Sequence, residues 1–234
     1  GAGFIGSHLV ERLVKLNHEV TVIDNLATGK IKNLSKVINK IKFFKKSICN
    51  LKDIKKAFYK QEVVIHLAAL ADIVPSIENP KEYFDTNVIG SQNIMLCSIK
   101  SKIKKVIYAA SSSCYGIPKK YPTKEKTILN PQYPYALTKK LGEDLIMHYG
   151  KVYNINTISL RLFNVYGLRA RSNNNYGAMF GVFLSQIYHN KKITIVGNGN
   201  QKRDFLFVDD VVEAIRLSVV KKLANQILNI GYGK

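Results

Sequence analysis

Tyr135 and Lys139 are the residues whose types and spacing most directly suggest catalysis. They lie four residues apart in the segment PYALTK (134–139), so both would project from one face of a helix. A tyrosine phenol ionises near pH 10, but a neighbouring cation lowers that pKa enough for the phenolate to act as a base. Ser111 follows an apolar segment and could hydrogen-bond the reacting oxygen. Because lysine is abundant in this chain, the pair alone would also suit an ordinary surface helix.

A glycine turn supplies the second chemical signal. The chain opens with GAGFIG and continues into an amphipathic segment, so a pyrophosphate could bind the turn and the helix N-terminus. Asp24 ends the next apolar run, 18 residues after Gly6, near the spacing of the acidic residue that binds a dinucleotide ribose. A carboxylate there would repel a 2′-phosphate, so NAD is favoured over NADP. The alternative is a plain turn with an acidic residue at the end of a strand. The glycine turn, Asp24 and the serine run stand in the order that favours catalysis over both simpler interpretations.

Short apolar runs alternate with helical patterns, which predicts an α/β fold with a Rossmann-type doubly wound parallel sheet. The expected strands are residues 20–24, 63–67, 106–110, 157–160 and 193–196. The expected helices are residues 7–16, 80–101, 135–149, 180–190 and 208–220.

A sheet of this kind begins with a strand directly before the glycine turn, and no residue precedes Gly1. We therefore expect a chain that lacks its first strand and is unstable or inactive by itself. The stretch 167–177 (GLRARSNNNYG) is the expected boundary between two domains. Residues 1–165 would form the dinucleotide-binding domain, and residues 166–234 would begin a smaller, truncated substrate-binding domain. A segment near 205–220 would pack back on the first domain.

Composition excludes several classes of protein. The formal charge is +20, but the lysines are scattered and no nucleic-acid-binding motif accompanies them, which favours a solvated surface. No apolar run of eighteen residues and no signal-peptide pattern occurs, so neither a membrane span nor export is expected. Three widely spaced cysteines form no disulfide framework, and the five histidines have no ligand spacing. These features predict a reduced, cytoplasmic setting and no metal site.

The whole chain resembles the extended short-chain dehydrogenases/reductases, in the NAD-dependent epimerase/dehydratase family and specifically its UDP-glucose 4-epimerase-like group. The matching motifs are GAGFIGSHL (1–9), VIDNLATG (22–29), HLAAL (66–70), SIENP (76–80), TNVIGSQN (86–93), ASSSCYG (110–116), PYALTK (134–139), RLFNVYG (161–167), GNGNQKRDFLFVDDVVEA (197–214) and LNIGYG (228–233).

The resemblance implies roles for individual residues. Cofactor contacts fall on Gly3, Phe4, Ile5 and Gly6 in the pyrophosphate turn, Asp24 and Asn25 at the adenosine ribose, Leu67, Ala68 and Ala69 at a strand end, and Asn87 beside them. Ser111, Tyr135 and Lys139 match the catalytic positions, and the last two would also contact the cofactor. Ser111, Asn164 and Arg203 would contact the substrate, the last two at its diphosphate. Ser47 stands where the family usually has an acidic residue near the adenine.

The residues after Ser111 discriminate between reactions. Similar dehydratases carry an Asp-Glu pair there and similar decarboxylases a Glu, whereas this chain has Ser112 and Ser113. That difference favours 4-epimerisation of a UDP-sugar. The resemblance further implies bound NAD and a homodimer formed partly by the helix after Asn87 and the Tyr135 helix. The alternatives are another sugar-nucleotide enzyme, such as a uronate epimerase, decarboxylase, dehydratase or reductase, and a non-catalytic NAD-binding protein. The intact trio of Ser111, Tyr135 and Lys139 argues against the non-catalytic alternative.

Overall fold

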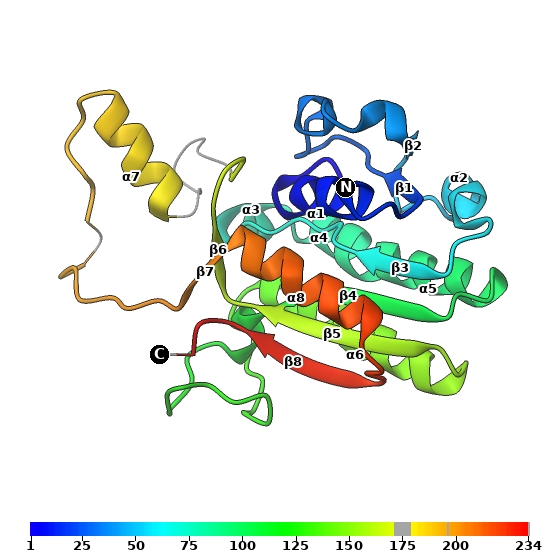
Figure 1. Cartoon of the computed structure of the whole chain (residues 1–234). Helices are drawn as coiled ribbons and strands as arrows, with labels where there is room; N and C mark the ends of the chain where they lie inside the picture. Colours follow the sequence, from blue (N-terminus) through cyan, green and yellow to red (C-terminus); the bar gives the residue numbers. More distant parts are fainter. Residues whose placement is uncertain (171–178, 196, 234) are drawn as a thin grey trace.

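Parallel strands form the centre of the computed structural model, which describes residues 1–170, 179–195 and 197–233 (Figure 1). One sheet pairs β1 (Val20–Ile23) with β2 (Ile41–Phe44). The next has the order β3-β4-β5-β8 and contains β3 (Val63–His66), β4 (Lys105–Ser111), β5 (Asn156–Leu162) and β8 (Gln226–Ile230). A third, short pair joins β6 (Asn164–Tyr166) to β7 (Phe205–Phe207).

Helices connect the strands. The α-helices are α1 (Phe4–Lys15), α2 (Leu51–Ile54), α3 (Ile73–Glu78), α4 (Pro80–Phe84), α5 (Gly90–Lys100), α6 (Pro134–Val152), α7 (Met179–Tyr188) and α8 (Val208–Val220). The 3-10 helices are η1 (Ile31–Leu34), η2 (Ile38–Lys40), η3 (Lys55–Phe58) and η5 (Ser112–Tyr115), and η4 (Asp85–Ile89) is a π-helical turn between α4 and α5.

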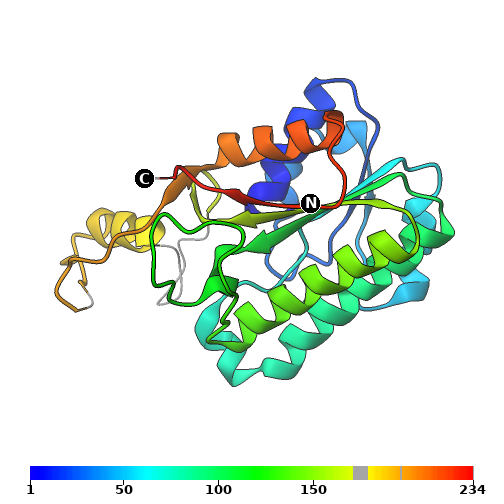
Figure 2. The same ribbon diagram turned by 90° about the horizontal axis from the view of Figure 1, so that it is seen from below.

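The helices cover both faces of the four-stranded sheet. Figure 2 shows α5 and α6 on one face and α1 and α8 on the other. Both strand faces are apolar: the core under α5 and α6 includes Met95 and Ile146, and the core under α8 includes Leu160 and Ile215. A parallel sheet buried on two faces confirms the predicted doubly wound α/β fold.

A slot separates the two larger sheets. β1 pairs with β2, and β3 begins the four-stranded sheet, so the facing edges of β1 and β3 are not joined to each other. A cavity of about 720 Å³ lined by residues of both strands, from Val20–Ile23 and from Val63–His66, lies between them.

The local sequence pattern failed at one predicted strand and missed four. Residues 193–195 form no strand, and Val196 lies outside the described residues. Ile193 and Ile195 are exposed, so apolar alternation there does not reflect pairing in a sheet. The strands β2, β6, β7 and β8 were not predicted, and they are three to five residues long. Length is not the whole reason, since β1 and β3 have four residues each and were predicted.

Candidate active site

A cavity of about 800 Å³ opens where the glycine turn meets the carboxyl ends of β1 and β3. Twelve of the predicted contact residues line it: Gly3, Phe4, Ile5, Gly6, Asp24, Asn25, Ser47, Leu67, Ala68, Ala69, Asn164 and Arg203. Parallel strands direct their carboxyl ends to one edge of a sheet, and ligands bind in the crevice outside that edge. The fold therefore gathers side chains that are up to 200 residues apart in the sequence, from Gly3 to Arg203.

The glycine turn fits a pyrophosphate. A Cβ atom added to Gly3 would meet nothing within 4 Å, so this position faces open space. At Gly6 it would lie 2.9 Å from the carbonyl oxygen of Gly1, so only glycine lets α1 begin this close to the turn. The first N–H groups of α1 have no partner within the helix and are free to donate to an anion.

Asp24 is held by backbone groups of the same turn. Its carboxylate accepts hydrogen bonds from the Gly1 amine at 2.9 Å and from the backbone N–H groups of Ala2 and Leu26 at 2.8 Å each. Burial raises the pKa of the carboxyl, but the charge and hydrogen bond of the Gly1 amine and the two backbone N–H groups outweigh it, so the pKa is lowered overall. A carboxylate has about four acceptor positions. Three are used, which leaves capacity for a ribose hydroxyl.

Asn25 and Ser47 lie on the rim of the same cavity, and both side chains brace local turns. The Asn25 side-chain oxygen accepts from the Ala27 N–H at 3.1 Å, and the Ser47 hydroxyl accepts from the Cys49 N–H at 3.2 Å. Their contacts with a cofactor stay predictions. Lys46, which the sequence analysis did not select, also lines this rim.

The serine run and Tyr135 form one hydroxyl cluster. β4 ends at Ser111, and the chain turns at once into η5, which brings Ser113 back over the strand end. The Ser111 and Ser113 hydroxyl oxygens lie 2.7 Å apart, and both hydroxyls hydrogen-bond Tyr135. Burial raises the pKa of the Tyr135 phenol, the two serine hydroxyls lower it in part, and it stays above its ordinary value.

Lys139 lies one helical turn after Tyr135 and is 4% exposed. Burial lowers the pKa of its ammonium to about 8, so the group is still mostly charged at neutral pH. The predicted trio of Ser111, Tyr135 and Lys139 thus comes from the end of β4 and the start of α6, two elements in contact.

The trio lies beside the cavity and is not part of its lining. Two residues of the cavity lining, Ala109 and Asp72, relate the cavity to the trio. Ala109 belongs to β4, two residues before Ser111, and the negative charge of Asp72 acts on Tyr135 and raises the pKa of its phenol. The phenol is therefore close to the cavity wall.

Asn87 is a buried residue that is hydrogen-bonded to Leu70 of the cavity lining. It is 1% exposed in η4 and is not among the lining residues. Its side-chain NH₂ donates to the Leu70 carbonyl and to the Thr138 hydroxyl, both at 3.0 Å, and its side-chain oxygen accepts from the Leu70 N–H at 2.9 Å. These bonds tie the loop after β3 to α6. Asn87 therefore positions the cavity wall, and its direct contact with a cofactor stays a prediction.

Asn164 and Arg203 are brought to the same cavity because β6 pairs with β7. Asn164 is in register with Phe205, and its side-chain NH₂ donates to the Asp204 carbonyl at 2.9 Å. Arg203 is exposed, and one guanidinium nitrogen donates to the Lys202 carbonyl at 2.8 Å. Both residues line the same cavity as the glycine turn, although they come much later in the sequence. Most of the predicted boundary stretch 167–177 lies outside the described residues.

Sequence reasoning missed a buried ion pair behind the trio. Arg161 of β5 and Glu143 of α6 are 3% and 1% exposed, and a guanidinium nitrogen of Arg161 lies 2.5 Å from a carboxylate oxygen of Glu143. Arg161 also donates to the Tyr115 hydroxyl at 2.8 Å. The available signal was a charged residue between Leu160 and Leu162, next to the predicted buried strand 157–160, because a buried charge requires a partner.

The described residues contain no group of three or more His, Cys, Asp and Glu side chains that could hold a metal ion. They also include no helix with the length and apolar composition that crossing a membrane requires.

Comparisons with known proteins agree with this geometry. The model of a family described as "NAD dependent epimerase/dehydratase family" matches residues 1–231. The chain is 40% identical over 237 residues to a Methanocaldococcus jannaschii protein named "Putative UDP-glucose 4-epimerase", covering all of this chain and 75% of that protein. It is 34% identical to a UDP-N-acetyl-alpha-D-glucosaminuronate decarboxylase of Bacillus cytotoxicus, covering 99% and 73%.

Among solved structures, the UDP-glucose 4-epimerase of Thermotoga maritima with UDP-glucose superimposes with a TM-score of 0.94 and 35% identity. That match covers all of this chain and 75% of the other.

Proposed function

Because the chain belongs to the NAD-dependent epimerase/dehydratase family, whose members modify sugar nucleotides with NAD, we propose that it inverts C4 of a UDP-sugar. The observation that supports this choice is the hydroxyl cluster. Ser111 and Ser113 hydrogen-bond Tyr135, and the run 111–113 carries no acidic side chain that would serve elimination or decarboxylation.

NAD fits the cavity through the glycine turn, the remaining acceptor capacity of Asp24 and the small side chains after β3. When bound, it supplies a reversible acceptor for the hydride at C4. Asn164 and Arg203 would hold the substrate's diphosphate in this proposal; both line the cavity, and a guanidinium matches phosphate geometry.

Tyr135 acts in this proposal as the base. As a phenolate it removes the proton of the sugar 4′-hydroxyl. The serine hydroxyls, which lower the pKa of the phenol, stabilise its charge, and in this proposal the Lys139 ammonium one helical turn away does so too. Inversion requires that the 4-keto sugar present its other face before the C4–H bond forms again. Tyr135 then returns the proton to the oxygen, so the cycle consumes no net reductant.

The proposal is tested by incubating the protein, without added NAD, with UDP-glucose, UDP-galactose, their N-acetyl forms and UDP-glucuronate. Proton NMR follows the anomeric signals. The expected result is conversion of one sugar to its C4 epimer, which would also identify the substrate. A keto, deoxy or decarboxylated product would replace epimerisation by the corresponding reaction.

We further propose two domains, residues 1–165 and residues from 166 onward. Two features support the division. α7 projects from the main body (Figure 1), and its described residues include no buried side chain. In contrast, α8 lies in the segment near 205–220 that is expected to pack back on the first domain, and it packs on α1 and the sheet through Val211 and Ile215.

A homodimer formed by α5 and α6 is also proposed. Leu96 and Leu137 lie on these helices and expose 38% and 46% of their surface, more than is usual for leucine. Sedimentation velocity of the wild type and of a Leu96→Asp/Leu137→Asp variant tests it, with a shift to monomer expected for the variant.

A further inference from the structure

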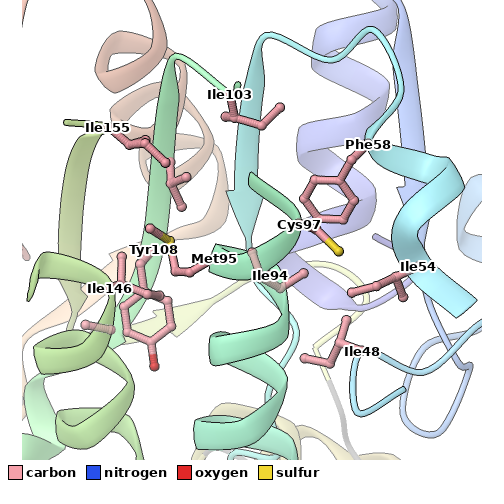
Figure 3. Close-up of a cluster of buried hydrophobic side chains, with 12 residues drawn as sticks. Ile48, Ile54, Phe58, Ile94, Met95, Cys97, Ile103, Tyr108, Ile146 and Ile155 are labelled. Carbon is pink, nitrogen blue, oxygen red and sulfur yellow. The ribbon is translucent and has the colours of Figure 1, made fainter. Parts of the chain in front are cut away.

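Tyr108 is a buried aromatic residue directly under the catalytic lysine. It lies in the middle of β4, is 1% exposed, and belongs to the core beneath α5 and α6 (Figure 3). The Lys139 ammonium nitrogen lies 4.1 Å from the centroid of its ring. A cation at that distance over an aromatic face is attracted by the ring quadrupole, most strongly where water is excluded.

The position of the ring is fixed from several sides. The Tyr108 hydroxyl donates to the Lys139 carbonyl at 3.3 Å, so the same residue contacts both ends of Lys139. A Cβ atom added to Gly142 would lie 2.6 Å from the Tyr108 hydroxyl oxygen, so the ring enters α6 where a side chain is missing. His66 stacks against the ring at 5.4 Å between centroids. Burial lowers the pKa of His66 to about 3, so it adds no competing positive charge.

The other groups near Lys139 do not stabilise its charge in place of the Tyr108 ring. Cys114 and Glu143 would each raise the pKa of the ammonium by their negative charge. Burial raises the pKa of Cys114 to about 11, so at neutral pH it is an uncharged thiol. The charge of Glu143 is neutralised by Arg161 at 2.5 Å.

We propose that Tyr108 is a positioning residue, whose ring face holds the Lys139 ammonium protonated and aligned with Tyr135. The inference rests on the proposed function, in which the charge of Lys139 makes Tyr135 a base. Tyr108 itself contacts neither reacting atom. It acts by opposing the desolvation that drives Lys139 toward its neutral form.

The test replaces the ring in graded steps. Tyr108→Phe keeps an electron-rich face and loses only the hydroxyl. A trifluorinated phenylalanine at the same position keeps the shape but weakens the quadrupole, and Tyr108→Leu removes the ring. Phe58→Leu is the matched control. Phe58 is 3% exposed in the same core and lies across the cluster from Tyr108 (Figure 3), so it reports general loosening of the core.

The first measurement is the pKa of Lys139, taken from carbon-13 NMR of ε-labelled lysine and assigned with Lys139→Met. The wild type, Tyr108→Phe and Phe58→Leu should agree. The trifluorinated and leucine variants should titrate about half a unit to one unit lower. Equal values in the trifluorinated variant and Tyr108→Phe would overturn the proposal, even if Tyr108→Leu fails to fold.

The second measurement is the pH dependence of kcat and KM. Loss of the ring should lower kcat at most about twofold at pH 7, where Lys139 stays largely protonated in every variant. The loss should grow to about three- to tenfold well above pH 8, in proportion to the protonated fraction of Lys139, and KM should stay unchanged. A folded wild type that binds NADH but converts none of the UDP-sugars would refute the proposed function, but the NMR titration would still decide the role of Tyr108.

Discussion

Tyr135 lies in surroundings that oppose its ionisation until other groups act on it. Burial and the charge of Asp72 raise the pKa of the phenol, while Ser111 and Ser113 lower it. The lysine ammonium and a bound nicotinamide cation would complete the shift toward a phenolate. The base is thus produced by the assembled site, since no single neighbour is sufficient.

We expect Tyr135→Phe to lower kcat about 10²- to 10⁴-fold, because the proton acceptor is lost while the ring still fills its place. NAD affinity, measured by calorimetry, should change little. Ser111→Ala should cost less, since Ser113 still hydrogen-bonds the phenol. Full activity of Tyr135→Phe would exclude Tyr135 as the base.

At the scale of elements, the loop after β6 is fastened to α1 close to the glycine turn. The Arg169 guanidinium donates to the Ser7 hydroxyl at 3.1 Å and to the Glu11 carboxylate at 2.7 Å. The Leu168 carbonyl lies 2.9 Å from a ring nitrogen of His8. Since Ala170 lines the cavity, this loop closes one side of the cofactor site.

Arg169→Ala should therefore weaken NAD binding about threefold to tenfold, mainly through faster dissociation. Stopped-flow fluorescence of NADH checks the rates. Arg216→Ala is the matched control, because Arg216 forms a similar ion pair with Glu213 within α8, and neither residue lines the cavity. Equal dissociation rates for the two variants would show that the loop does not retain the cofactor.

The buried pair of Glu143 and Arg161 connects α6, β5, β8 and the segment before α6. The Tyr115 hydroxyl, which accepts from Arg161, donates to the Asn229 side chain at 2.7 Å. The Asn229 side-chain NH₂ donates in turn to the Thr123 carbonyl at 2.9 Å. These bonds hold the end of β8 and the loop beside the serine run in one network.

Arg161→Met should lower the free energy of unfolding by about 3–5 kcal/mol, because Glu143 is left buried without a partner. The double variant Arg161→Met/Glu143→Leu should recover much of that loss, since it removes both charges. Urea unfolding followed by circular dichroism gives both values. A double variant no more stable than Arg161→Met would show that the network contributes beyond charge pairing.

At the scale of the whole molecule, the lysines are scattered along the chain but are densest in one segment. Residues 30–60 contain eleven lysines, all exposed, and a single acidic residue, Asp53. They lie in and around β2, beside the cavity that Lys46 lines. Such a field attracts anions and raises their association rates.

The association rate of NADH should fall several-fold between ionic strengths of about 0.01 M and 0.15 M. Reversing two charges near β2, with Lys42→Glu and Lys45→Glu, should slow association more than the same change at Lys221 and Lys222, which follow α8. Equal effects of the two pairs would assign the attraction to net charge alone.

The sequence by itself determined the class of fold, the glycine turn with Asp24, and the pair Tyr135 and Lys139. Each is a local signal: a periodicity of apolar residues, a turn that only glycine can form, or a spacing that defines one helical face. These signals do not depend on distant contacts, and the four strands without such a local signal, β2, β6, β7 and β8, were missed.

Only the tertiary structure decided how these residues act together. It gave Asn87 a buried bracing position, added Ser113 to the Tyr135 cluster, and placed Tyr108 under Lys139. It also paired Glu143 with Arg161 across α6 and β5. The physical reason is that pKa values and hydrogen-bond partners depend on burial and on residues brought together across the sheet, which no local spacing records.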